Sequence, residues 1–141
     1  MNTRSDSAEF IRTLVLGQHE ANDRYEQKLD DQGWIGFPRF LATAFFLAVG
    51  RRFPAGGNHG EIVRFVADLR ATSPDTASIL DAQATELVIR AALEPDVTFD
   101  LDQATIGKIQ TMVLHKVLSD ENLSPAELDA FLDEAEALAA T

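Results

Sequence analysis

Apolar residues recur along the chain mostly at intervals of three and four, the spacing that places them on one side of an α-helix. The pattern is clear at Ile62, Phe65, Val66 and Leu69, which fall at i, i+3, i+4 and i+7. Proline, glycine and capping residues interrupt it at several points. The spacing therefore predicts six helical segments, which span residues 6–29, 38–50, 58–69, 74–93, 100–117 and 124–138.

Several of these segments begin with side chains that can accept hydrogen bonds from the free N–H groups of a first helical turn. Ser124 and Glu127 form a capping-box pattern, and Pro125 suits the first helical position. Asp6 followed by Glu9 is an acidic version of the same pattern. Further caps are expected at Asn58, Ser73 and Asp100.

Residues 38–50 are apolar on nearly every helical face, which is typical of a helix buried on all sides. The apolar run 40–49 is about half the roughly 20 residues that a membrane span needs. The main β-prone stretch, residues 97–99, is too short to form a sheet by itself. We therefore expect a single all-α domain over residues 1–141, a compact bundle-like arrangement of about six helices around helix 38–50.

The composition narrows the class of protein further. The chain has 141 residues, 45% of them hydrophobic, and no cysteine, so it lacks disulfides, thiol nucleophiles and cysteine-ligated metals. Its first residues contain no apolar stretch of the kind that a secretory signal needs. Its net charge of −11 opposes contact with nucleic-acid phosphates. We expect a cytoplasmic protein with neither nucleic acid nor membrane as a partner.

The charge is unevenly distributed along the chain. Residues 34–72 carry five arginines against Glu61 and Asp68, whereas residues 73–141 carry three basic residues against fourteen acids. Charge asymmetry of this kind bears on partners rather than on the fold. It predicts a protein partner, or a second copy of the chain, that presents an acidic surface to the basic region.

Two helix–loop–helix units, around residues 40–72 and 106–138, correspond at an offset of 66 positions. At that offset Glu61 matches Glu127 and Phe65 matches Phe131. The correspondence is consistent with an internal repeat, and equally with two unrelated capped amphipathic helices.

Four residues of the basic region are candidates for partner binding: Trp34, Arg51, Arg52 and His59. Trp and Arg are frequent among residues that dominate binding energy. The alternative for the only Trp is a plug that covers a helix junction. The arginines could instead stabilise the end of the preceding helix or pair with Glu61 and Asp68.

His59 belongs to the basic, glycine-rich segment 51–60, which opens a helix. Such a place can bind an anion through free N–H groups. The segment lacks the Gly-Lys-Ser/Thr sequence of a nucleotide-binding loop. The alternative is a connection whose glycines only permit unusual backbone angles.

Candidate metal ligands are His19, Asp23 and Asp120. His19 and Asp23 are one helical turn apart, in a pattern similar to the zinc-protease motif with Asp in the second histidine position. The acidic stretches at residues 96–102 and 119–122 lack the glycine and glutamate positions of a calcium loop. The alternative is a solvated charged helix face. His115 is interpreted as a half-buried structural residue.

Residues 112–138 resemble a helix–turn–helix repeat of the tellurite-resistance TerB family, in which an apolar helix leads through an acidic turn into an amphipathic helix that begins with Glu. The matching residues are Leu118-Ser119-Asp120, Leu123-Ser124 and Glu127. Glu121 stands where the family has glycine after the aspartate. The resemblance implies an acidic helical domain that binds metal.

No catalytic constellation or cofactor motif is readable, and no cofactor is predicted. The favoured hypothesis is a non-enzymatic cytoplasmic helical module for protein–protein interaction, an adaptor or a regulator. The alternatives are an acidic metal-binding protein similar to the TerB family, and an acidic inhibitor that mimics nucleic acid through residues 73–141.

Overall fold

The computed structural model describes residues 5–54 and 59–141, and within them the chain forms eight α-helices and no strand. This confirms the all-α prediction, with eight helices in place of about six. The helices are α1 (Asp6–Leu16), α2 (His19–Gln32), α3 (Phe37–Arg52), α4 (His59–Arg70), α5 (Pro74–Ile79), α6 (Ala82–Leu93), α7 (Gln103–Asp120) and α8 (Pro125–Ala139).

The prediction of one helix over residues 6–29 is wrong, because the chain turns at Gly17. Gly17 has a φ of 71°, in the left-handed region that glycine adopts without steric cost. The N–H groups of Gly17 and Gln18 bond the carbonyls of Leu14 and Thr13 at 3.2 and 2.9 Å, which closes α1. The apolar spacing continues across the break because α1 and α2 pack against each other. The cap of α1 is Ser5 rather than Asp6, since Ser5 Oγ accepts from the Ala8 N–H at 3.1 Å.

A second break divides the predicted helix 74–93 into α5 and α6. Leu80 is extended, and its carbonyl accepts a hydrogen bond from Arg70 Nε at 2.8 Å. Asp81 then caps α6 by accepting from the Ala84 N–H at 2.9 Å. An aspartate at this point favours a new helix start over continuation, because its side chain competes for backbone N–H groups.

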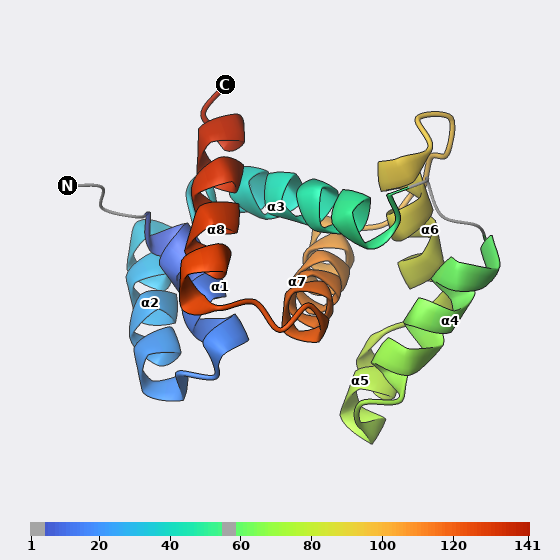
Figure 1. Ribbon diagram of the computed structural model, residues 1–141, viewed down its shortest axis with the longest axis horizontal. Helices are drawn as coiled ribbons and strands as arrows, with labels where there is room; N and C mark the ends of the chain where they lie inside the picture. The colour runs from blue at the N-terminus through green and yellow to red at the C-terminus, as the bar shows by residue number, and fades with distance from the viewer. Residues whose placement is uncertain (1–4, 55–58) are drawn as a thin grey trace.

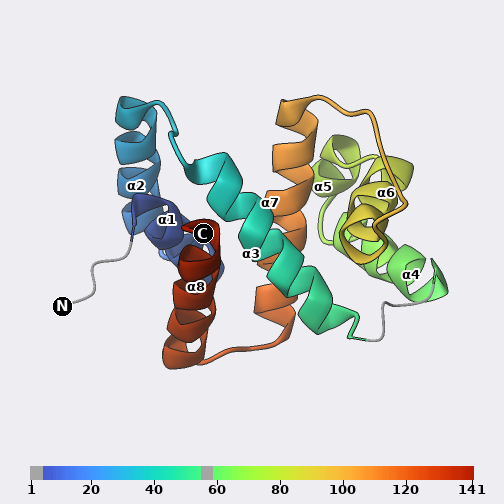
Figure 2. The same cartoon turned by 90° about the horizontal axis from the view of Figure 1, so that it is seen from above.

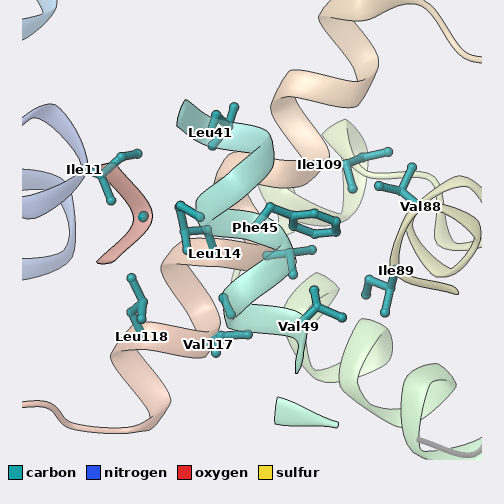
Figure 3. Close-up of a cluster of buried hydrophobic side chains, with 14 of the residues drawn as sticks. Ile11, Leu41, Phe45, Val49, Val88, Ile89, Ile109, Leu114, Val117 and Leu118 are labelled. Carbon is teal, nitrogen blue, oxygen red and sulfur yellow. The ribbon is translucent and has the colours of Figure 1, made fainter. Parts of the chain in front are cut away.

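Two crossing helices, α3 and α7, form the centre of the molecule (Figures 1 and 2). Helices α1, α2 and α8 lie to one side of them, and α4, α5 and α6 lie to the other. Phe45 and Val49 of α3 meet the α7 side chains Leu114 and Val117 in the buried cluster (Figure 3). Phe45 is 3% exposed. The central place predicted for the apolar helix is therefore confirmed.

The later helices begin as their capping residues require. Ser124 and Glu127 form the predicted capping box of α8, and their hydrogen bonds lower the pKa of the Glu127 carboxyl. Helix α7 is capped by Asp102 rather than by Asp100, with the Thr105 N–H 2.7 Å from the Asp102 carboxylate. Bonding to Thr105 lowers the pKa of Asp102. Asn58 lies outside the described residues, so its predicted cap and the repeat built on it stay predictions.

Every helix within residues 5–54 and 59–141 is too short or too polar to cross a lipid bilayer.

Candidate functional site

Trp34 packs at the junction of α1, α2 and α3. Its indole meets the rings of Phe10 and Phe37 edge-on, with centroids 5.5 and 5.0 Å apart, and its Nε1 donates to an Asp30 carboxylate oxygen at 2.6 Å. The residue is half-buried and has a φ of 59° between the left-handed Gly33 and Gly36. This geometry agrees with a plug at the helix junction, and one edge of the indole lines a surface hollow described below.

Arg51 and Arg52, in the last turn of α3, hold internal contacts. The Arg51 guanidinium lies 2.6 Å from the Glu121 carboxylate and 5.6 Å from the centre of the Phe131 ring. The Arg52 guanidinium stacks over the rings of Phe53 and Phe65, at 5.0 and 5.5 Å. Both cations also face the partial negative charge at the helix end. These contacts favour a structural role for both arginines.

The four residues predicted to bind a partner do not form one surface. Trp34 precedes α3, whereas Arg51 and Arg52 end it, so the length of this 16-residue helix, about 24 Å, separates them. His59 is exposed at the start of α4. Residues 55–58 of the glycine-rich segment lie outside the described part of the chain, so its proposed anion site has no geometry to report.

The predicted metal ligands are also spread over different helices. His19 and Asp23 are exposed on α2, and the Asp120 carboxylate pairs with Lys116 of α7 at 3.0 Å. Across the described ranges, no three His, Asp or Glu side chains lie close enough together to hold one metal ion.

His115 lies on α7 with part of its surface exposed to solvent while burial desolvates its imidazole, in keeping with the half-buried residue interpreted from the sequence. It lines a hollow of about 310 Å³ together with Lys116, Asp120 and Thr76. The walls of this hollow remove water from the imidazole, and that desolvation lowers the pKa of His115.

The side of α3 that points away from the core is apolar and uncovered. We call this the α3 outer face; its residues, all exposed, are Ile35, Pro38, Arg39, Ala42, Phe46 and Gly50. Ile35 is 83% exposed and Phe46 60% exposed. Figure 2 shows that α3 lies on the near side of the molecule in that view, in front of α7. Exposed apolar surface concentrated on one helix is characteristic of an interaction site.

The α3 outer face also differs in charge from the rest of the protein. The sequence contains no acidic residue between Asp31 and Glu61, although the chain carries 23 acids. Arg39 is the charged residue of this face, and its guanidinium makes no ion pair within the described residues. The face is thus apolar with one available cation.

A second feature is an open hollow of about 370 Å³ beside the first half of α7. We call it the α7 hollow; its lining residues are Phe10, Trp34, Phe37, Leu41, Ile79, Gly107, Lys108, Thr111 and Met112. They come from α1, α3, α5 and α7 and from the turn before α3. Ile79, at the end of α5, is 53% exposed.

Gly107 forms part of the α7 wall of the hollow. A Cβ added at Gly107 meets no atom within 4 Å, so packing does not require glycine at this position. Glycine in a helix interior costs about 1 kcal/mol relative to alanine. Nothing in the backbone of α7 offsets that cost, because Gly107 does not have a positive φ.

Sequence reasoning missed both the α3 outer face and the α7 hollow. Phe45 and Phe46 are adjacent in a helix and point about 100° apart. Adjacent residues such as Val117 and Leu118 are nevertheless both buried, so this pair carried no signal for an uncovered side of α3. For the α7 hollow, the available signal was Gly107 itself, because an isolated glycine inside a helical pattern often has a packing or functional reason.

No protein-family model matches the chain, and no curated protein or solved structure matches it either.

Proposed function

We propose that this protein is a non-enzymatic, cytoplasmic helical interaction module, an adaptor or regulator, and that the α3 outer face contacts its protein partner. The observation that carries the proposal is the exposure of Phe46 on α3 and of Ile35 in the turn before it, within a stretch of the sequence, residues 32–60, that has no acidic residue. Fully burying a side chain of this size stabilises a complex by about 1.5–3 kcal/mol. A partner that covers both residues would thus gain a substantial share of a micromolar affinity, about 8 kcal/mol.

The chemistry of the α3 outer face defines the partner. Arg39 and Phe46 are seven residues apart, about two helical turns, and so share one side of α3, and Arg39 lines a hollow together with Ile35 of the preceding turn and Glu136 of α8. A complementary surface therefore combines apolar side chains with a carboxylate that can pair with Arg39 in a bidentate manner. We therefore still expect a partner with an acidic group. We propose that this group pairs with Arg39 rather than with Arg51 or Arg52.

A second copy of the chain is a specific candidate for this partner. In an antiparallel arrangement centred between Ala42 and Thr43, Phe46 of one copy would lie against Arg39 of the other. Ile35 would lie against Gly50, where a Cβ meets nothing within 4 Å. Each large apolar side chain of one copy would thus face a small or cationic residue of the other copy. In an isologous two-fold interface the same contacts recur on both sides of the axis, so one surface patch serves both copies.

Two measurements test the proposal. Sedimentation velocity over a wide protein concentration range shows whether a second copy is the partner. Capture of partners from host extract then compares the wild type with Phe46→Glu and with the control Val63→Glu, which alters a 38% exposed residue on α4. We expect Phe46→Glu to abolish either self-association or capture, and Val63→Glu to leave both intact. Equal behaviour of the two variants would contradict the proposal.

The other two functions stay hypotheses with a simpler test. Metal binding predicts that calcium, magnesium or zinc raises the melting temperature, since a ligand that binds only the folded state stabilises it. Asp23→Ala or Asp120→Ala should then remove the effect. Nucleic-acid mimicry predicts that the captured partner is a nucleic-acid-binding protein that contacts residues 73–141.

A further inference from the structure

The walls of the α7 hollow are built for an apolar chain. Phe10, Trp34 and Phe37 form one wall of three rings in mutual edge-to-face contact, with centroids 5.0–5.7 Å apart. The aliphatic side chains Leu41 and Ile79 contribute other parts of the lining. The volume of about 370 Å³ lies near the lower end of the range for small-ligand pockets, roughly 300–1,000 Å³.

The polar groups of the lining select one kind of head group. Lys108 is the charged residue of the lining, and within the described residues it makes no ion pair. Its charge acts on nearby Asp102, whose pKa is lowered first by hydrogen bonds from Thr105 and then by Lys108. A lysine stem can lie along apolar surface while its ammonium stays in water at the mouth. The Thr111 hydroxyl already donates to the Gly107 carbonyl at 2.8 Å, so it cannot donate to a ligand at the same time. Lys108 is then the donor left for an anionic group.

We propose that the α7 hollow binds a medium-chain aliphatic carboxylate, with its hydrocarbon chain against the aromatic wall and its carboxylate at the Lys108 ammonium. A medium-length chain suits a pocket near the lower end of the small-ligand range. The single cation matches a single negative charge, and the hollow offers no cluster of cations for a phosphate. The site is separate from the α3 outer face, because Phe37 and Leu41 are buried residues of α3 while the outer face is the exposed side.

Gly107 supplies a direct means of closing the site. The space that its absent side chain leaves is open, so a larger residue can occupy the hollow without displacing a neighbour of its Cβ. Gly50 of α3 is a matched control, because it is also helical and a Cβ added there also has nothing within 4 Å. A leucine at either position adds the same apolar group to a helix.

The test uses the full chain and sodium decanoate, below the concentration at which decanoate forms micelles. Trp34, the single tryptophan, lines the hollow and reports binding through its fluorescence, and titration calorimetry supplies the stoichiometry. We expect saturable one-to-one binding that Gly107→Leu weakens at least tenfold and Gly50→Leu leaves unchanged. Lys108→Gln should weaken decanoate about twofold to fivefold, the range of an exposed ion pair, and leave 1-decanol unaffected.

Several results would overturn the proposal. They are the absence of saturable decanoate binding, equal affinity of Gly107→Leu and the wild type, and equal affinity of the wild type for decanoate and 1-decanol. Circular dichroism checks that each variant is folded. If Gly107→Leu does not fold, Gly107→Ala serves instead, with Gly50→Ala as its control, and an undiminished affinity in Gly107→Ala then overturns the proposal. Binding of decanoate does not depend on Phe46, so this test and that of the interaction face can fail separately.

Discussion

The Arg51 guanidinium, at the end of α3, lies 2.6 Å from the Glu121 carboxylate at the end of α7. The contact joins the C-terminal ends of the two central helices, and Arg51 also covers the Phe131 ring of α8. One side chain of α3 thus contacts the end of α7 and a ring of α8, two consecutive helices that are distant from α3 in sequence. This contact favours a structural role for Arg51, and its predicted role in partner binding stays a prediction.

A double-mutant cycle with Arg51→Gln and Glu121→Gln should give a coupling energy of about 0.2–1 kcal/mol. The value is modest because the two side chains are 43% and 29% exposed, so water and salt screen the pair. Urea unfolding at low and high salt measures it. A coupling of zero at low salt would show that the contact contributes nothing to stability.

Charge reversal at both arginines, Arg51→Glu with Arg52→Glu, should lower the stability by about 1–2 kcal/mol, because it removes the ring contacts as well as the ion pair. Thermal unfolding provides the measurement. An unchanged melting temperature together with weakened association would instead return these arginines to the partner-binding surface.

Adjacent phenylalanines of α3 should differ sharply. Phe45→Ala empties a packed site and should cost roughly 3–5 kcal/mol, whereas Phe46→Ala should change the stability by no more than about 0.5 kcal/mol. Chemical denaturation of both variants tests the orientation of the helix. Similar losses for the two would mean that the outer face is covered in the folded chain.

Glycine-to-alanine substitutions should have opposite signs at two positions. Gly17→Ala should destabilise by about 1 kcal/mol, because Gly17 has a φ of 71° at the end of α1. Gly107→Ala should stabilise by up to about 1 kcal/mol, because α7 is regular there and a Cβ meets no neighbour. Melting temperatures of the two variants decide the matter, and a loss at Gly107 would show that this position is packed.

His115 should make the protein less stable as the pH falls. Desolvation lowers its folded pKa below the ordinary 6.5, so the unfolded chain takes up the proton first. Its unfavourable contribution is absent above pH 6.5 and grows as the pH drops through the window between 6.5 and the folded value. Lys116 and Asp120 line the same hollow and pair with each other at 3.0 Å. Melting curves between pH 7.5 and 5 should show a smaller decline for His115→Gln than for the wild type or for His19→Gln, which changes an exposed histidine of α2. Equal slopes would exclude this role for His115.

The helical class and most of the core could be predicted from the sequence because they depend on local spacing and capping. The capping box of α8 could be recognised from Ser124 and Glu127 alone. The helical spacing of apolar residues placed Phe65 in the core, where it is 1% exposed. The break at Gly17 was missed because α1 and α2 pack against each other and continue one apolar period across the turn. The break at Leu80 was missed because α5 and α6 both pack against α4, which keeps the apolar spacing through the break. A glycine or an aspartate at such a position can lie within one continuous helix or between two helices, and the tertiary contacts decide which of the two forms.

The candidate sites could not be predicted in the same way. Helix α3 is apolar all round, so its pattern does not distinguish the buried Phe45 from the exposed Phe46. The α7 hollow depends on how α1, α3, α5 and α7 converge, and its residues are spread between Phe10 and Met112. Long-range convergence of this kind leaves no period or motif in the chain.

Photo-cross-linking from position 46 in the native host tests the interaction face most directly. Benzoylphenylalanine replaces Phe46 in one variant and Val63 in the control, since both side chains are exposed but lie on α3 and α4. A discrete cross-linked product from position 46, lost when Arg39→Glu is added and absent from position 63, is the expected result. Identical products from both positions, or none from position 46 while the protein is folded and expressed, would contradict an interaction module built on α3.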